Sequence, residues 1–148
     1  MISNTVEVAL PPDRAIALWL DTARWPTFVE GFGHVELRDP DWPDPGSKVV
    51  WESRAGGRGR VTEKVRELDA ACVVLSVYED ALHGTETVRC EHGEQGGARV
   101  TIELDYELEN GGPLKKLTDA IFIRRALSDA QKRTLRRFAT EAAEEGQL

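Results

Sequence analysis

The feature that most constrains this chain is a stretch of about thirty residues, from Pro113 to Glu145, with no interior proline or glycine. It is long enough for one helix that spans a whole domain. Its apolar residues share one helical face, as expected for a helix that lies on a sheet: Leu114, Leu117, Ile121, Leu135, Phe138, Ala139 and Ala142. Midway, Arg125, Ser128 and Lys132 occupy the same sector. We therefore expect a pocket, rather than a solid core, between the helix and its sheet.

The preceding residues are typical of strands joined by short turns. Alternating apolar residues predict a first strand in 2–10, and Pro12 begins the first of two short helices, 12–21 and 23–30. Period-two patterns and turn residues then delimit six more strands, in 33–39, 48–54, 60–68, 72–79, 82–92 and 98–109. Short connections favour antiparallel hairpins. We predict one α+β domain, residues 1–148, with a curved seven-stranded antiparallel sheet, two short N-terminal helices and one long C-terminal helix.

Counting residues from the turns predicts how the strands pair. The expected partners are Val65 with Leu75, Glu63 with Val77 and also with Trp51, Leu75 with Glu86, Glu86 with Leu104, Val73 with Val88, Val88 with Ile102, and Cys90 with Val100. This register collects apolar residues on one face of the sheet and polar residues on the other, and a slip by one residue would invert the two faces. Cys72 and Cys90 then point to opposite faces, so we expect no disulfide between them.

Composition excludes several classes of protein. The net charge of −7 argues against nucleic acid as the main partner. No apolar run approaches the length of a transmembrane span, and the first ten residues do not form a secretory leader, so we expect a cytoplasmic protein. The two cysteines and three histidines lack the spacing of metal ligands, and we expect no metal and no cofactor.

Basic residues gather on the long helix within this acidic chain. Eight lie between Leu114 and Arg137, against two acids, Asp119 and Asp129. This stripe would suit an anionic partner. The simpler interpretation is a solvated face with ion pairs four residues apart, such as Asp129 with Arg133.

Local sequence motifs carry a resemblance that covers nearly the whole chain. They are Asp21-Thr-Ala-Arg-Trp-Pro-Thr-Phe28, Gly46-Ser-Lys-Val-Val-Trp51, Gly59-Arg-Val-Thr-Glu-Lys-Val-Arg-Glu-Leu-Asp69, Gly97-Ala-Arg-Val-Thr101 and Asp105-Tyr-Glu-Leu108. With the order of elements, they resemble the polyketide cyclase/dehydrase-like branch of the START and Bet v 1 (SRPBCC) superfamily. The resemblance implies a helix-grip fold whose cavity takes lipids, quinones, hormones or aromatic polyketides. It implies no catalytic residue here, because the motifs are turns and packing positions.

Two carboxylates, Glu63 and Glu86, are predicted on the apolar face of the sheet. There they would have raised pKa values and could act as acid and base on an enolisable carbonyl, with Arg125 stabilising an oxyanion. The simpler interpretation pairs them with Arg124 or Arg125 from the helix, because buried charge is tolerated mainly when it is matched.

The other candidate pocket residues are those predicted to face the space between sheet and helix. They are Trp51, Ser53, Val65, Leu75, Val88, Cys90, Ile102, Leu104, Tyr106, Ile121 and Ser128. Trp51 and Tyr106, with Phe122, could stack on an aromatic ligand, although inward aromatic residues more often belong to the core. Ser53, Tyr106 and Ser128 could donate to a ligand carbonyl. The loop Gly56-Gly57-Arg58-Gly59 is expected to be a hairpin tip at the pocket mouth.

Three classes of function stay open. The first is the binding of a hydrophobic or aromatic small molecule of lipid, quinone or polyketide type. The second is a polyketide cyclase, aromatase or dehydratase that uses the cavity carboxylates. The third is a protein-interaction module that uses the basic helix face. A protein partner or homodimer is neither indicated nor excluded.

Overall fold

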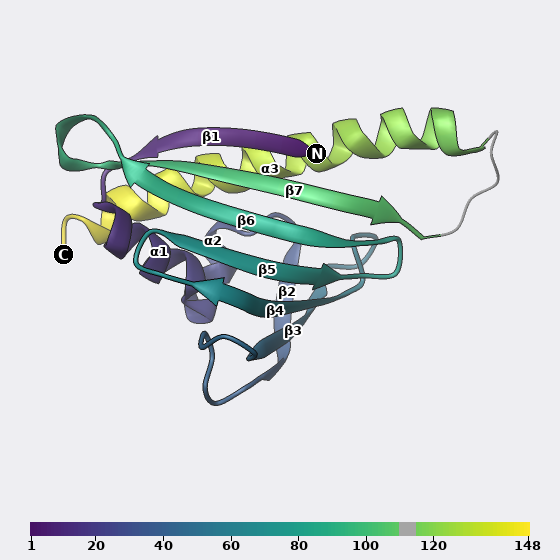
Figure 1. The fold of residues 1–148 in the computed structure, drawn as a ribbon, viewed down its shortest axis with the longest axis horizontal. Coiled ribbons are helices and arrows are strands. Elements are labelled where there is room, and N and C mark those ends of the chain that lie inside the picture. Colours follow the sequence, from purple (N-terminus) through teal and green to yellow (C-terminus); the bar gives the residue numbers. More distant parts are fainter. Residues whose placement is uncertain (110–114) are drawn as a thin grey trace.

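The computed structural model describes residues 1–109 and 115–148, without the side chains of 115–119. Figure 1 shows a curved sheet with a long helix along one face and two short helices at one end. The elements are β1 (Ile2–Val8), α1 (Pro12–Leu20), η1 (Thr22–Arg24), α2 (Trp25–Phe28), β2 (Phe32–Arg38), β3 (Lys48–Ser53), β4 (Arg60–Leu68), β5 (Cys72–Tyr78), β6 (Leu82–His92), η2 (Glu94–Gly96), β7 (Ala98–Leu108) and α3 (Lys115–Glu145). The seven strands are antiparallel in the order β1-β7-β6-β5-β4-β3-β2. The predicted helix-grip fold is confirmed.

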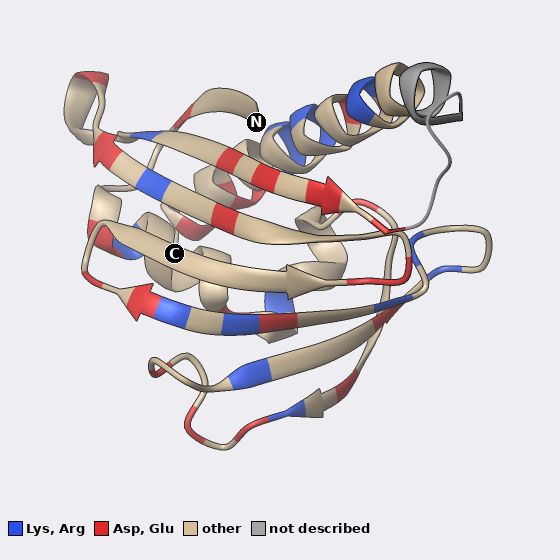
Figure 2. Ribbon diagram, turned by 45° about the vertical axis from the view of Figure 1, so that its right-hand side comes forward, with Lys and Arg blue, Asp and Glu red and all other residues tan. Residues whose placement is uncertain are grey.

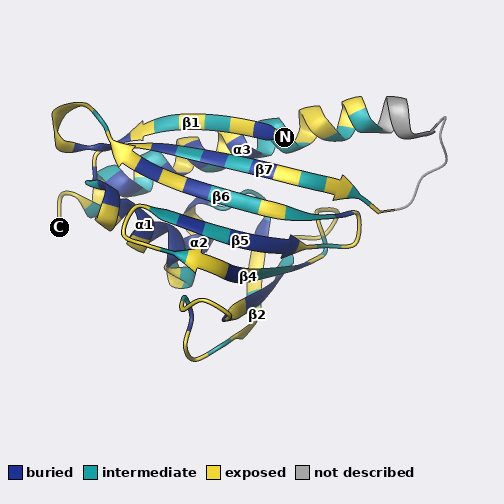
Figure 3. Ribbon diagram, in the orientation of Figure 1, coloured by how far each residue is buried: buried dark blue, intermediate teal, exposed yellow. Residues whose placement is uncertain are grey.

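The predicted register is confirmed across β4 to β7. Val65 pairs with Leu75, Leu75 with Glu86, and Glu86 with Leu104. A bulge beside Val65 absorbs a turn between β4 and β5 that is one residue longer than expected. Along the second half of β6 and the first half of β7, buried residues alternate with more exposed ones (Figure 3), as the sequence pattern predicted.

The pairing predicted between Trp51 and Glu63 is wrong. Trp51 pairs with Val61, and Glu63 pairs with Val49. The hairpin turns one residue earlier than the predicted strands 48–54 and 60–68 imply, because the backbone amide of Ser53 donates to the carbonyl of Gly59 at 2.8 Å. This shifts the pairing by two residues. Gly59 has a φ of 80°, a conformation that glycine adopts at little cost. Both side chains still lie on the concave face.

Aromatic residues fill the space between the short helices and α3. The rings of Trp19 and Phe28 each pack edge-on against Phe138, with centroids 5.0 Å apart. Trp25 packs against Phe32 and Trp42 in the same edge-on manner. This cluster anchors the C-terminal half of α3 to one end of the sheet.

Only part of α3 buries its apolar stripe. Leu135, Phe138 and Ala142 are buried, and Ala139 packs against the core, as predicted. Ile121, predicted to face the sheet, is 63% exposed, so that prediction is wrong. The predicted start at Pro113 and Leu114, and the side chain of Leu117, lie outside the described residues.

Ion pairs tie α3 to the segment around α2. Arg24 pairs with both Glu141 and Glu145. Arg133 and Arg137 both pair with Glu30, so the ion pair predicted between Arg133 and Asp129 is replaced by a contact across the fold. Figure 2 shows basic residues recurring along α3 and acidic residues along β6 and β7.

The two edge strands are arranged differently. On β1, Asn4 Nδ2 donates to the Oε1 of Gln131 on α3, at 2.8 Å. On β2, the ladder with β3 shifts register twice, between Phe32 and His34 and between Val35 and Leu37. None of the described helices has both the length and the apolar content that a membrane span requires.

Candidate functional site

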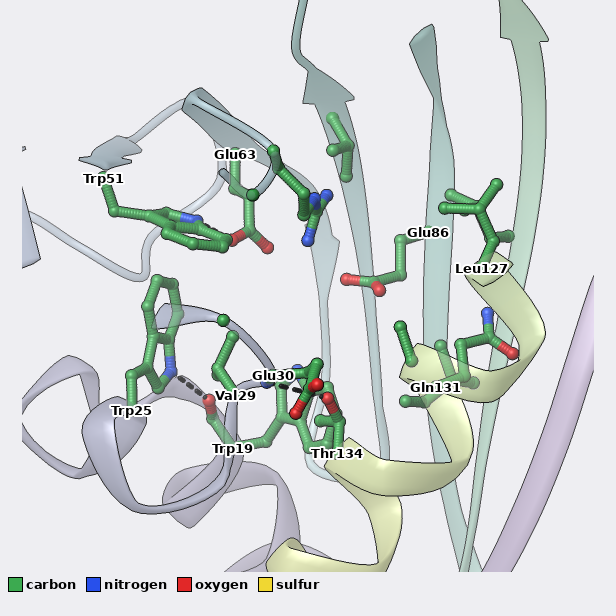
Figure 4. A pocket seen from close by; sticks show the side chains of 17 residues that line it. Trp19, Trp25, Val29, Glu30, Trp51, Glu63, Glu86, Leu127, Gln131 and Thr134 are labelled. Atoms are coloured by element: carbon green, nitrogen blue, oxygen red, sulfur yellow. Dashed lines mark hydrogen bonds between the residues drawn. The ribbon is translucent and has the colours of Figure 1, made fainter. Parts of the chain in front are cut away.

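A cavity of about 260 Å³ lies between the concave face of the sheet and the middle of α3. Its walls come from the short helices, the α2–β2 and β3–β4 loops, the five strands β3 to β7, and α3. The lining residues are Trp19, Trp25, Val29, Glu30, Gly31, Trp51, Gly57, Arg58, Glu63, Val77, Glu86, Ile102, Leu104, Leu127, Ala130, Gln131 and Thr134. In Figure 4, Trp25 and Trp51 stand on one side of this space, and Glu86, Leu127 and Gln131 on the other.

Glu63 and Glu86 project into the cavity from β4 and β6. Burial raises the pKa of Glu86 from 4.5 to about 8, and the negative charge of Glu63 adds to the rise. Burial also raises the pKa of Glu63, against a hydrogen bond of 2.6 Å from the indole nitrogen of Trp51. Among the described residues, no basic side chain forms an ion pair with either carboxyl group.

Arg58 supplies a positive charge at the edge of this cavity. It lies at the tip of the β3–β4 hairpin, with its guanidinium carbon 5.3 Å from the centre of the Trp51 ring. Its charge is committed to Glu79, at 2.5 Å, whose side chain is only 4% exposed. The charge of Arg58 opposes the rise in the pKa values of Glu63 and Glu86 but does not cancel it, and Arg58 pairs with neither carboxylate.

The wall contributed by α3 and the α2–β2 loop is polar at two points. Thr134 Oγ1 accepts from the backbone amide of Glu30 at 3.0 Å, and the Glu30 carboxylate is held by Arg133 and Arg137. Burial favours a raised pKa for Glu30, but the hydrogen bonds from the two arginines outweigh it, and the pKa is lowered. Glu30 is thus neutralised within the protein, unlike the two glutamates on the sheet.

Gln131 has an unused hydrogen-bond donor. Its side chain is buried, its Oε1 accepts from Asn4, and its Nε2 has no partner among the described residues. The orientation of the Asn4 amide follows from Ser128, because the Asn4 Nδ2 also donates to the Ser128 carbonyl oxygen and lies 3.2 Å from its hydroxyl. Gln131 is among the residues that line the cavity, and its Nε2 atom is shielded from solvent.

Five of the predicted pocket residues line the cavity: Trp51, Glu63, Glu86, Ile102 and Leu104. Four others, Val65, Leu75, Val88 and Cys90, are buried in the core beneath it.

The remaining predicted residues are absent from the lining. Arg125 and Ile121 are exposed on α3, and Arg124 donates to the Met1 carbonyl oxygen. The placement expected for Arg125, and its pairing with the glutamates, are therefore wrong. Ser53 bonds to the backbone of its own hairpin, and Ser128 bonds to Asn4. Tyr106 is partly buried, and Phe122 is 78% exposed.

Sequence reasoning missed Gln131 and Thr134. It placed the loop that contains Arg58 at the pocket, where Gly57 and Arg58 do line the cavity, but gave Arg58 no role. Leu127, Gln131 and Thr134 recur at helical spacing with Leu135 and Phe138, so a wheel restricted to the second half of α3 would have found that wall. No periodic pattern points to Arg58, which lies in an irregular loop. Among the described residues, no group of three or more His, Cys, Asp or Glu side chains is arranged to hold a metal ion.

Comparisons with solved structures reveal close likeness of fold at low sequence identity. The di-domain aromatase/cyclase StfQ of the steffimycin biosynthetic pathway is 14% identical with a TM-score of 0.78, covering 99% of this chain and 51% of that one. The Zhui aromatase/cyclase of Streptomyces sp. R1128 is 17% identical with a TM-score of 0.69, covering 96% of this chain and 92% of that one. TTHA0849 from Thermus thermophilus is 17% identical with a TM-score of 0.76, covering 97% of both chains.

These likenesses concern the fold alone. No curated protein matches the sequence. Residues 1–143, nearly the whole chain, match the family described as polyketide cyclase / dehydrase and lipid transport. The protein therefore belongs to the polyketide cyclase/dehydrase and lipid transport family.

Proposed function

We propose that this protein binds a small hydrophobic or aromatic molecule between its sheet and α3, with a polar group of the ligand against Glu63 and Glu86. The observation that carries the proposal is a cavity walled by Trp19, Trp25 and Trp51 in which two carboxyl groups lack a counter-ion among the described residues. Apolar walls with a few convergent polar groups are typical of ligand sites. The family supports this class of ligand, and a cytoplasmic location stays a prediction.

The cavity limits the size of the ligand. A cavity of about 150 Å³ is known to hold one benzene ring, and ligand pockets begin near 300 Å³. At about 260 Å³, this cavity suits a body of about two fused rings. A larger ligand would have to extend past Arg58 into solvent.

Two tryptophan substitutions on α3 test the proposal. Ala130 lines the cavity and Ala126 is exposed one turn earlier, so Ala130→Trp fills the site while Ala126→Trp adds the same ring outside it. Native mass spectrometry with extraction should recover a small molecule from the wild type and from Ala126→Trp, and not from Ala130→Trp. Circular dichroism checks that both variants fold. Equal recovery from all three proteins would contradict a ligand in this cavity.

Catalysis at the same site is the second candidate, favoured by the raised pKa of Glu86, about 8, beside a second carboxyl group. A protonated Glu86 and an ionised Glu63 could serve as acid and base on an enolisable carbonyl, as in a cyclase or dehydratase. Glu63→Gln and Glu86→Gln should then retain ligand binding and lose turnover. Turnover that survives both changes would exclude this role.

A protein-interaction role for the basic face of α3 has less support. Arg133 and Arg137 are both held by Glu30 within the fold. Salt-sensitive copurification of an acidic partner would be the evidence needed to reopen it.

A further inference from the structure

The charges around the cavity are unevenly matched, and this imbalance points to the chemistry of the ligand. Glu30 is held by two arginines, and Arg58 is held by Glu79. Glu63 and Glu86 remain as neighbouring carboxyl groups without a positive partner among the described residues. A buried carboxylate that has no counter-ion either takes up a proton or requires a cation from outside the chain.

The aromatic walls favour the same kind of group. The face of Trp51 already attracts the Arg58 guanidinium, 5.3 Å from the ring centre. Trp19 and Trp25 supply further aromatic surface within the cavity. Aromatic side chains combined with carboxylates attract ammonium groups, because the ring face and the carboxylate both present negative potential.

Gln131, on the opposite wall of the cavity, carries a hydrogen-bond donor that the described residues leave unpaired. Gln131 is only 8% exposed, and its Nε2 donor has no partner in the described part of the chain. A buried donor left unpaired costs about 1–3 kcal/mol. An acceptor near Gln131 on the helix side would remove this cost, and a cation on the sheet side would match the two carboxyl groups.

We propose that the ligand is an amine: an aromatic body whose ammonium group lies between Glu63 and Glu86, with an oxygen acceptor directed to Gln131. This inference rests on the proposed binding function and names its ligand class. Carboxylate ligands are disfavoured, because they would add a negative charge beside two carboxyl groups that lack a positive partner among the described residues.

Binding of a cation is then linked to loss of a proton. The groups around Glu86 are Glu63 from β4, Arg58 and Glu79 from the adjoining loops, and Gln131 from α3. Because the pKa of Glu86 is about 8, amine affinity should rise roughly tenfold per pH unit between about pH 6 and pH 7.5. A neutral ligand should show no such rise.

Three naphthalene derivatives of similar shape test the proposal by isothermal titration calorimetry of the whole protein. Naphthylmethylamine is a cation, naphthylmethanol is neutral, and naphthoic acid is an anion at pH 7. We expect the amine to bind at least about tenfold more tightly than the alcohol, the anion not to bind, and buffers of different ionisation enthalpy to reveal proton release. Glu86→Gln should abolish the pH dependence, whereas Glu91→Gln, an exposed position on the same strand, should retain it.

The outcomes separate the two proposals. If the alcohol or the acid binds as tightly as the amine, or if amine affinity is flat with pH, the amine preference is overturned and the binding function stands. If none of the three binds at millimolar concentration, both proposals are overturned.

Discussion

Replacing Glu86 with glutamine should stabilise the free protein, and the gain should depend on pH in a defined direction. Folding raises the pKa of Glu86 from 4.5 to about 8. A carboxyl group with a raised pKa contributes fully to stability below about pH 4.5, and that contribution falls as the pH rises to about 8. Glutamine has a similar shape and cannot ionise, so the variant escapes this loss.

The magnitude follows from the pKa difference. A difference of one in pKa corresponds to about 1.4 kcal/mol. As the pH rises from 4.5 to 7, the raised pKa of Glu86 lowers the free energy of unfolding by at most about 3 kcal/mol. Water that enters the cavity screens part of this effect. We expect Glu86→Gln to gain about 1–3 kcal/mol at pH 7 and close to nothing at about pH 4.5.

Urea unfolding at several pH values measures this gain directly. The matched control is Glu91→Gln, which removes an exposed carboxylate from the same strand and should change stability by less than about 0.5 kcal/mol. Two results would refute an unpaired carboxyl group in the cavity. One is a Glu86→Gln variant that is no more stable than the wild type at pH 7, and the other is a gain in stability that is the same at about pH 4.5 and at pH 7.

Three further substitutions probe the scaffold around the site. Arg24→Met breaks the ion pairs with Glu141 and Glu145 and should lower the free energy of unfolding by about 1–2 kcal/mol in urea. A double-mutant cycle with Glu141→Gln should show coupling, and additive effects would count against the pair. Trp51→Phe removes the indole donor to Glu63, so the Glu63 pKa should rise further in an NMR titration; an unchanged pKa would show that the bond is not formed. Gly84→Ala places a methyl group against the backbone of β7, 2.9 Å from a Cα atom, and should destabilise the sheet by more than about 2 kcal/mol; a neutral effect would be inconsistent with this strand register.

The sheet was predictable because its pattern has a period of two and its turns are short. Glu86 lies opposite both Leu75 and Leu104, as counting from the turns predicted. The count failed between Trp51 and Glu63, across the longer β3–β4 loop, because loop length alone does not tell at which residue the turn begins. The hairpin turns one residue earlier than expected, where Gly59 adopts a positive φ and its carbonyl accepts from the amide of Ser53.

The site was less predictable than the sheet, since it depends on where α3 meets the concave face. A helical wheel identifies a face but not the point along the axis where contact begins. Ile121 and Arg125 share the predicted sector but lie in the exposed first half of α3, whereas Leu135 and Phe138 are buried. The ion pairs of Glu30 with Arg133 and Arg137 were also unexpected, because they join residues about one hundred positions apart.

An open sheet has two margins at which a foreign strand could add itself, and the two differ here. The outer strand β1 is tied to α3 through Asn4 and Gln131. At the opposite margin, the two register shifts in β2 break up the even row of amides and carbonyls that an incoming strand would need. Removing those irregularities would leave a straighter template, and self-association into fibrous aggregates is the hazard that the kinked margin guards against.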